Sequence, residues 1–132
     1  MRDYVKVFLY VPLSRAVRSI DGRVFEDPLR EMLNVIGAMA DRGVGVVGNY
    51  DNVSFAFAKG TGRYRAIPGS PANPTKGEIG EVHSEEEAIL TFVAPKDALT
   101  DILRAIKDNH PYETPAIEVF DLVRHEWDGL PP

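Results

Sequence analysis

Apolar residues that alternate along the chain, interrupted by helical spacing, restrict this sequence to few folds. Valine or leucine occupies every second position in residues 4–11, which predicts a strand with one buried face that ends at Pro12. Asp27 then caps a predicted helix, with apolar residues at helical spacing through residues 28–42. Alternation returns in residues 50–58, so the first half is predicted to be strand, helix, strand.

The second half repeats this order. Residues 87–93 have strand character, a helix with one apolar face follows Lys96, and the segment 110–112 ends it before a last strand at 116–123. The order βαββαβ predicts an α+β, ferredoxin-like fold, in which a four-stranded antiparallel sheet carries two helices on one face. Residues 13–26 show neither period and are expected to form a turn-containing loop or a short hairpin.

Composition narrows the class of protein. The 132 residues predict a single domain over residues 1–132, and the lack of cysteine excludes disulfides and thiolate metal sites. A net charge of −5 argues against a nucleic-acid partner. No stretch approaches the roughly 20 apolar residues that cross a bilayer, so we expect no membrane partner and a cytoplasmic location.

One face of the predicted sheet has no helix to cover it. Apolar residues occupy both parities of the third strand, at Ile89, Leu90, Phe92 and Val93. A sheet that is apolar on both faces needs a second cover, so we predict self-association.

The stretch from residue 59 to residue 80 is rich in glycine and proline and is predicted to be a long loop. Between Lys59 and Lys76 it also carries Arg63 and Arg65 but no acidic residue, within an acidic chain. Its guanidinium groups and free backbone amides suit an anion such as a phosphate or carboxylate. The alternative is a solvated loop whose charges only maintain solubility.

The segment His110-Pro111-Tyr112-Glu113 places an imidazole, a phenol and a carboxylate within four residues. A metal or proton role is one interpretation, with further ligands from a neighbouring subunit. The alternative is structural, with His110 bonded to helix carbonyls and Pro111 fixing the turn. His83 lies in an acidic run, residues 81–87, that we expect to be solvated. No serine lies in a nucleophile elbow, so the sequence predicts no hydrolytic triad.

Several motifs line up together and resemble the inserted domain of YqfO-type proteins, the longer bacterial members of the Nif-three-like family. They are Gly48-Asn49-Tyr50-Asp51, Ser54-Phe55, Gly60-Thr61-Gly62-Arg63-Tyr64, Ala72-Asn73-Pro74, Gly77 with Gly80, and His110-Pro111-Tyr112-Glu113-Thr114-Pro115-Ala116. The last motif also resembles the CutA divalent-cation-tolerance family. The resemblance implies the ferredoxin-like fold, and it implies trimers with ligands in clefts between subunits, as in CutA and PII signalling proteins.

YqfO-type proteins flank this domain with two halves that hold a dinuclear metal site. We find no such halves, so we expect a free-standing version of the insert and do not carry over hydrolase chemistry. Residues 13–27 look like an insertion relative to the family, and residues 123–132 have no counterpart in it. We expect these two segments to carry what is particular to this protein.

These observations together predict a non-enzymatic, trimeric PII/CutA-like module that binds a small anionic ligand or a divalent cation at subunit interfaces. Arg63 and Arg65 would pair with the anion, and His110 and Glu113 would form hydrogen bonds to the ligand or ligate a metal. The predicted ligand-binding residues are Asn49, Tyr50, Arg63, Arg65, His110, Tyr112 and Glu113. One alternative is a structural oligomerisation or protein-interaction module without a small ligand, and a third is a metal-dependent hydrolase.

Overall fold

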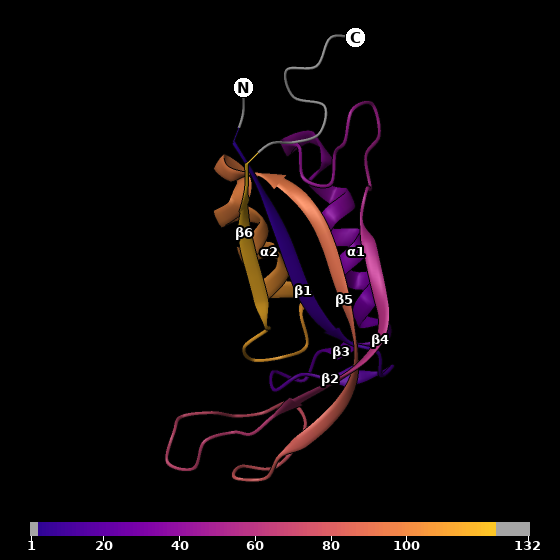
Figure 1. Cartoon of the computed structure of the whole chain (residues 1–132). Coiled ribbons are helices and arrows are strands. Elements are labelled where there is room, and N and C mark those ends of the chain that lie inside the picture. The colour runs from indigo at the N-terminus through magenta and orange to yellow at the C-terminus, as the bar shows by residue number, and fades with distance from the viewer. Residues whose placement is uncertain (1–2, 124–132) are drawn as a thin grey trace.

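The protein is seen here as a computed structural model that describes residues 3–123. Of the C-terminal segment 123–132, only residue 123 lies within this range. A four-stranded sheet in the order β4-β5-β1-β6 carries both α-helices on one face (Figure 1). The main elements are β1 (Tyr4–Pro12), α1 (Pro28–Ala38), β4 (Phe55–Tyr64), β5 (His83–Pro95), α2 (Leu99–Asn109) and β6 (Ile117–Leu122). This arrangement confirms the predicted ferredoxin-like class.

The central strand β1 pairs antiparallel with β5 on one side and with β6 on the other. Its residues Val5, Val7, Leu9 and Val11 are at most 1% exposed. Because side chains alternate along a strand, this row lies on the helix-facing side. The row packs with Met32 and Ile36 of α1 and with Ile102 and Ile106 of α2 in a single apolar cluster.

The helices begin and end where local chemistry allows. The Asp27 carboxylate accepts the Arg30 backbone N–H at 3.2 Å, as expected of an N-cap, and Pro28 occupies the first turn. A short 3₁₀ helix, η1 (Ala40–Arg42), follows α1 and ends at Gly43, whose φ of +86° is left-handed. A second 3₁₀ turn, η2 (Lys96–Ala98), leads into α2.

The predicted loop at 59–80 is partly wrong. Strand β4 runs to Tyr64 and β5 starts at His83, so only residues 65–82 connect them. Glycine does not break this strand because Gly60 and Gly62 pair with residues of β5. A Cβ at Gly62 would collide with the Glu87 carboxylate, so the missing side chain makes room for a neighbour. The predicted start at residue 50 was also wrong, since Asn52 has a φ of +54° in a turn before the strand.

Residues 13–26 form the short hairpin that the sequence left as one alternative. Its strands are β2 (Val17–Arg18) and β3 (Val24–Phe25), which pair antiparallel. Val17 and Phe25 are buried beneath it. The Arg23 guanidinium lies 4.3 Å from the centre of the Phe25 ring and also donates to Asn109 at the end of α2, so the hairpin is held against the body of the domain.

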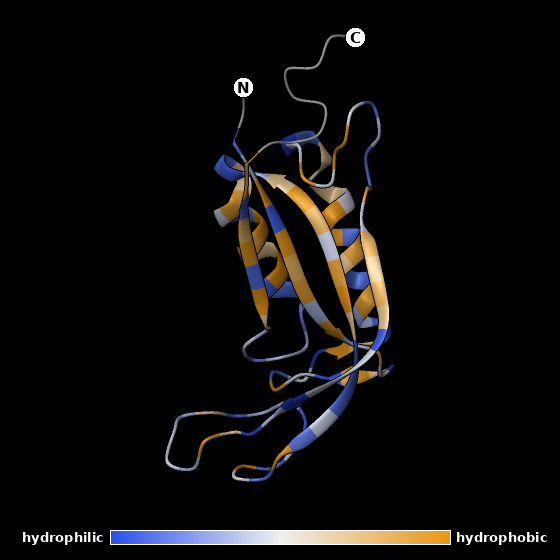
Figure 2. Cartoon of the chain, in the orientation of Figure 1, coloured by the Kyte–Doolittle hydropathy of each residue, from blue (hydrophilic) through white to orange (hydrophobic). Residues whose placement is uncertain are grey.

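Among residues 3–123, no helix covers the opposite face of the sheet, and Figure 2 shows many hydrophobic residues along its strands. Phe55 and Phe57 of the edge strand β4 are 59% and 54% exposed, and Phe120 of β6 is 49% exposed. Phe8 packs edge-on against Phe120, with ring centres 5.4 Å apart. An aromatic patch of this kind is unusual on an isolated surface. Within residues 3–123, neither helix is long and apolar enough to cross a membrane.

Replacing Leu9 by alanine should lower the free energy of unfolding by about 2 to 5 kcal/mol, because it opens a cavity under both helices. Leu33→Ala is the matched control, since Leu33 is 37% exposed on α1. This substitution should lower the free energy of unfolding by about 1 kcal/mol or less. Urea denaturation followed by circular dichroism measures both variants. Equal losses would contradict the assignment of the core.

Candidate functional site

A groove of about 620 Å³ lies at the end of the sheet where β4 and β5 extend beyond the helices. One wall is the end of β4 with the residues after it, from Gly62 to Ala66, together with Pro74. The other wall is the segment from Tyr112 to Ala116 that leads into β6. Tyr10 of β1 and Glu87 of β5 also line the groove. The glycine, A-N-P and H-P-Y-E motifs, which are far apart in sequence, therefore meet here.

Hydrogen bonds join the two walls. The backbone N–H of Asn73 donates to Glu113 Oε2 at 2.9 Å, and the Thr75 hydroxyl donates to the Pro111 carbonyl at 2.7 Å. Tyr64 packs edge-on against Tyr112, with ring centres 5.9 Å apart. These contacts span about 40 residues of sequence and give the groove a defined shape.

The four basic residues of the 59–76 stretch divide into two kinds. Lys59 pairs with Glu86 at 3.2 Å, and Lys76 pairs with Glu85 at 3.4 Å. The Arg63 side chain forms no hydrogen bond or ion pair within the described part of the chain. Arg65 donates Nε to the Gly80 carbonyl at 2.9 Å, which leaves its two terminal nitrogens available. Both arginines line the groove without a carboxylate partner.

His110 has a structural role in this conformation. It is 4% exposed, its Nε2 donates to the Tyr10 carbonyl at 2.9 Å, and its Nδ1 accepts the Tyr112 backbone N–H at 3.0 Å. Burial lowers the pKa of His110 to about 4, and the hydrogen bond to Tyr10 opposes this shift. Because both ring nitrogens are engaged by backbone, the prediction that His110 ligates a metal has to be corrected.

The Tyr112 hydroxyl is a buried polar group in the wall of the groove. This hydroxyl is buried without a hydrogen bond of normal geometry to any residue in 3–123. Burial raises the pKa of this phenol, and the neighbouring Tyr64, Glu87 and Glu85 raise it further. Glu87 behaves similarly, because burial and the nearby Glu85 raise the pKa of its carboxyl group. Both groups favour their neutral, proton-bearing forms.

The acidic run near His83 was predicted to be solvated, and for Glu85 this was wrong. Glu85 is 9% exposed, accepts the Ser14 hydroxyl, and lies 2.8 Å from His83 Nε2. Burial opposes its ionisation, but the bonds from Ser14 and His83 and the charge of Lys76 outweigh burial and lower its pKa. Strand alternation from the buried Leu90 through Ala88 would not have placed Glu85 inward, so this contact had no clear signal in the sequence.

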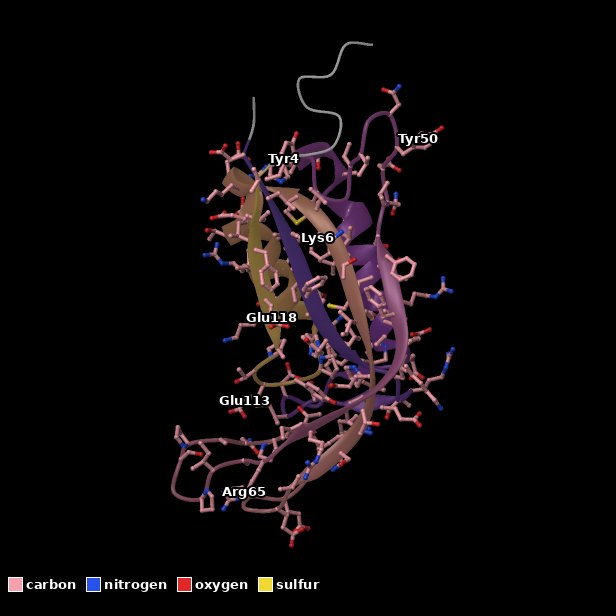
Figure 3. The ribbon with its side chains drawn as sticks, viewed as in Figure 1. Tyr4, Lys6, Tyr50, Arg65, Glu113 and Glu118 are labelled. Atoms are coloured by element: carbon pink, nitrogen blue, oxygen red, sulfur yellow. The ribbon has the colours of Figure 1, made fainter. Side chains whose placement is uncertain are left out.

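Asn49 and Tyr50 do not join the other predicted residues within one chain. Tyr50 is 75% exposed in the turn before β4, at the opposite end of the sheet from Arg65 and Glu113 (Figure 3). The structure brings together Arg63, Arg65, Tyr112 and Glu113, with His110 behind them. Among the described residues, no three His, Cys, Asp or Glu side chains gather as metal ligands.

The sequence is similar to curated proteins named GTP cyclohydrolase 1 type 2 homolog. It is 36% identical to the Mycobacterium leprae protein over 107 residues, which cover 81% of this chain and 27% of that protein. It is 29% identical to the Bacillus subtilis protein over 105 residues, which cover 73% of this chain and 27% of that protein. Residues 79–128 match the family model described as CutA1 divalent ion tolerance protein.

Solved structures agree on the fold. A Bacillus cereus protein related to NIF3 superposes with a TM-score of 0.66 at 24% identity, over 93% of this chain and 26% of that protein. CutA1 from Ehrlichia chaffeensis superposes with a TM-score of 0.58 at 14% identity, over 96% of this chain and 92% of that protein. The chain has the fold of the CutA1 structures and is similar in sequence to part of the GTP cyclohydrolase 1 type 2 homologs. This CutA-like domain spans only about a quarter of the length of the curated relatives that it matches, 27% of the Mycobacterium leprae protein.

The buried imidazole makes the stability of this CutA-like domain depend on pH. His110 titrates near 6.5 when unfolded and about 4 when folded, so only the unfolded state gains a proton between these values. The contribution of neutral His110 to the free energy of unfolding is complete above about pH 6.5. It is lost as the pH falls, and the loss reaches about 3 kcal/mol near pH 4. Urea denaturation from pH 7 to pH 4 should show the wild type losing stability relative to His110→Gln. An imidazole pKa of 6.5 or higher by NMR would contradict this.

Proposed function

We propose that this protein is a non-enzymatic, trimeric PII/CutA-like module that binds a small anionic ligand in the groove, beside a subunit interface. The observation that carries this proposal is that Arg63 and Arg65 line a groove at one end of the sheet. The Arg63 side chain has no partner within residues 3–123, and Arg65 uses only its Nε, in a bond to the Gly80 carbonyl. Guanidinium groups bind carboxylates and phosphates through two parallel hydrogen bonds. Two arginines with available nitrogens in one groove therefore suit an anion.

Binding is favoured over metal chemistry by the side chains present. Both nitrogens of His110 are bonded to backbone, and Glu113 accepts a backbone N–H, so neither is set up as a metal ligand. The name of the relatives refers to a GTP-transforming enzyme, but the chain covers 27% of the Mycobacterium leprae protein. We therefore propose an anion in place of the divalent cation.

The uncovered sheet face supports the trimer. A second, smaller hollow of about 280 Å³ lies along β4 and is lined by Phe57 and Ile89. It shares Tyr10, Gly62 and Glu87 with the groove, so the groove adjoins the apolar face without a break. A second copy packed on that face would thus border the ligand.

A structural module without a ligand is the second candidate. It is favoured by the contacts of Asn73 with Glu113 and of Thr75 with Pro111, because these motif residues also serve to shape turns. Loss of the two arginines distinguishes the candidates, since neither guanidinium contributes to these contacts.

The double substitution Arg63→Ala with Arg65→Ala should abolish phosphate binding and leave the assembly intact. The expected readout is thermal stabilisation by inorganic phosphate, because a ligand at 100 times its Kd adds roughly 2.7 kcal/mol. Arg18→Ala with Arg104→Ala is the control, since both arginines are exposed and lie outside the groove. Phosphate binding that survives the first pair, or is lost equally in both, would count against the site.

Phe57→Lys should convert the trimer to a smaller species, because it places a charge on the uncovered sheet face. Light scattering should give about three times 14.6 kDa for the wild type and a lower mass for the variant. Ile20→Lys is matched in exposure, since both side chains are 54% exposed, and it should leave the mass unchanged. A wild-type monomer would refute the proposed assembly.

A further inference from the structure

The groove is much larger than the anionic group that its arginines can bind. Small-molecule sites of roughly 300 to 1,000 Å³ hold ligands of drug-like size, and this groove of about 620 Å³ falls in that range. A bare phosphate or acetate would leave most of the volume to water. The volume of the groove therefore suits an anionic group that is attached to a larger organic group.

The lining indicates the chemistry of that body. Tyr10, Tyr64 and Tyr112 all contribute to the walls, with Pro74 and three alanines between them. Aromatic side chains contact other rings in offset or edge-on geometry, and such pairs contribute about 0.5 to 1.5 kcal/mol beyond the area that they bury. A flat ring suits this lining better than a flexible polar chain.

The charges of the groove limit how many anionic groups the ligand carries. Glu87, Glu113 and Glu118 line the same groove as Arg63 and Arg65. Glu113 accepts from Asn73 and Glu118 accepts the Tyr10 hydroxyl at 2.6 Å, so neutral donors hold these two carboxylates and they do not pair with the arginines. A polyphosphate would meet the arginines and the carboxylates together, whereas a single anionic group can reach the arginines alone.

We propose that the ligand of this groove is a small aromatic acid, in which a flat ring bears one carboxylate or phosphate group. The anionic group lies between Arg63 and Arg65, and the ring lies along the tyrosine and proline wall. This inference rests on the proposed anion-binding function and adds the class of ligand to it.

Titration calorimetry on the full chain tests the inference with matched probes. Benzoate is compared with acetate, and phenyl phosphate with inorganic phosphate, so the members of each pair share the type of anionic group and only one of them carries the ring. The ringed member of at least one pair should bind about tenfold tighter or more, and the pair that shows it identifies the anionic group. GTP tests whether a ring with three phosphates binds better than a ring with one.

Tyr64→Leu should remove the preference for the ringed probe, and Tyr64→Phe should restore it, because phenylalanine keeps the ring and loses only the bond to the Lys76 carbonyl. The Arg63→Ala, Arg65→Ala pair should weaken all probes alike. If Tyr64→Leu does not fold, the ratio of the wild-type affinities for the ringed and ringless probes still tests the inference.

The outcomes separate the two proposals. Inorganic phosphate or acetate that binds as tightly as its ringed counterpart overturns the aromatic ligand and leaves the anion site standing. GTP that binds more tightly than phenyl phosphate overturns the single anionic group. Failure of every probe to bind at millimolar concentration overturns the aromatic ligand and the anion-binding function together.

Discussion

The pairing of β1 with both β5 and β6 is the constraint on which the rest of the structure depends. Val5, Val7, Leu9 and Val11 must lie under the helices, and strand alternation then sends Phe8 and Tyr10 to the other face. Tyr10 therefore lines the groove, and its backbone carbonyl accepts a hydrogen bond from His110 Nε2. A slip of one residue in this pairing would exchange the two faces and remove both contacts.

The groove forms because β4 and β5 extend beyond the helices. Beyond the irregularity between Phe57 and Gly60, β4 continues beside β5, where Gly62 leaves room for the Glu87 side chain of the neighbouring strand. The buried Glu85, held by Ser14, His83 and Lys76, stabilises the base of this extension. The following loop can then contact the segment before β6, and the two walls close around the tyrosines.

The hydrogen bonds and ion pairs of the charged groups around the groove support the ligand binding that we propose. Its lysine neighbours and most of its acidic groups are satisfied within the domain, whereas Arg63 and part of Arg65 are not. His110, the residue most often associated with reactivity, is neutral, buried and bonded at both nitrogens. In the function that we propose, the groups available to a ligand are two arginines and an aromatic wall, and the adjoining sheet face is available to a second copy.

The sequence by itself determined the order of elements, the fold class and the helix-facing row of β1, because period and capping are local properties that the packed domain preserves. It also brought Arg63, Arg65, Tyr112 and Glu113 together as candidates. Only the tertiary structure decided the rest. Glycine in residues 59–64 suggested a loop, yet pairing with β5 supplied hydrogen bonds that local propensity cannot foresee. His110 suggested a metal ligand until burial engaged both of its nitrogens, and Tyr50 proved distant from the groove, because a motif carries residue types but not the distances between them.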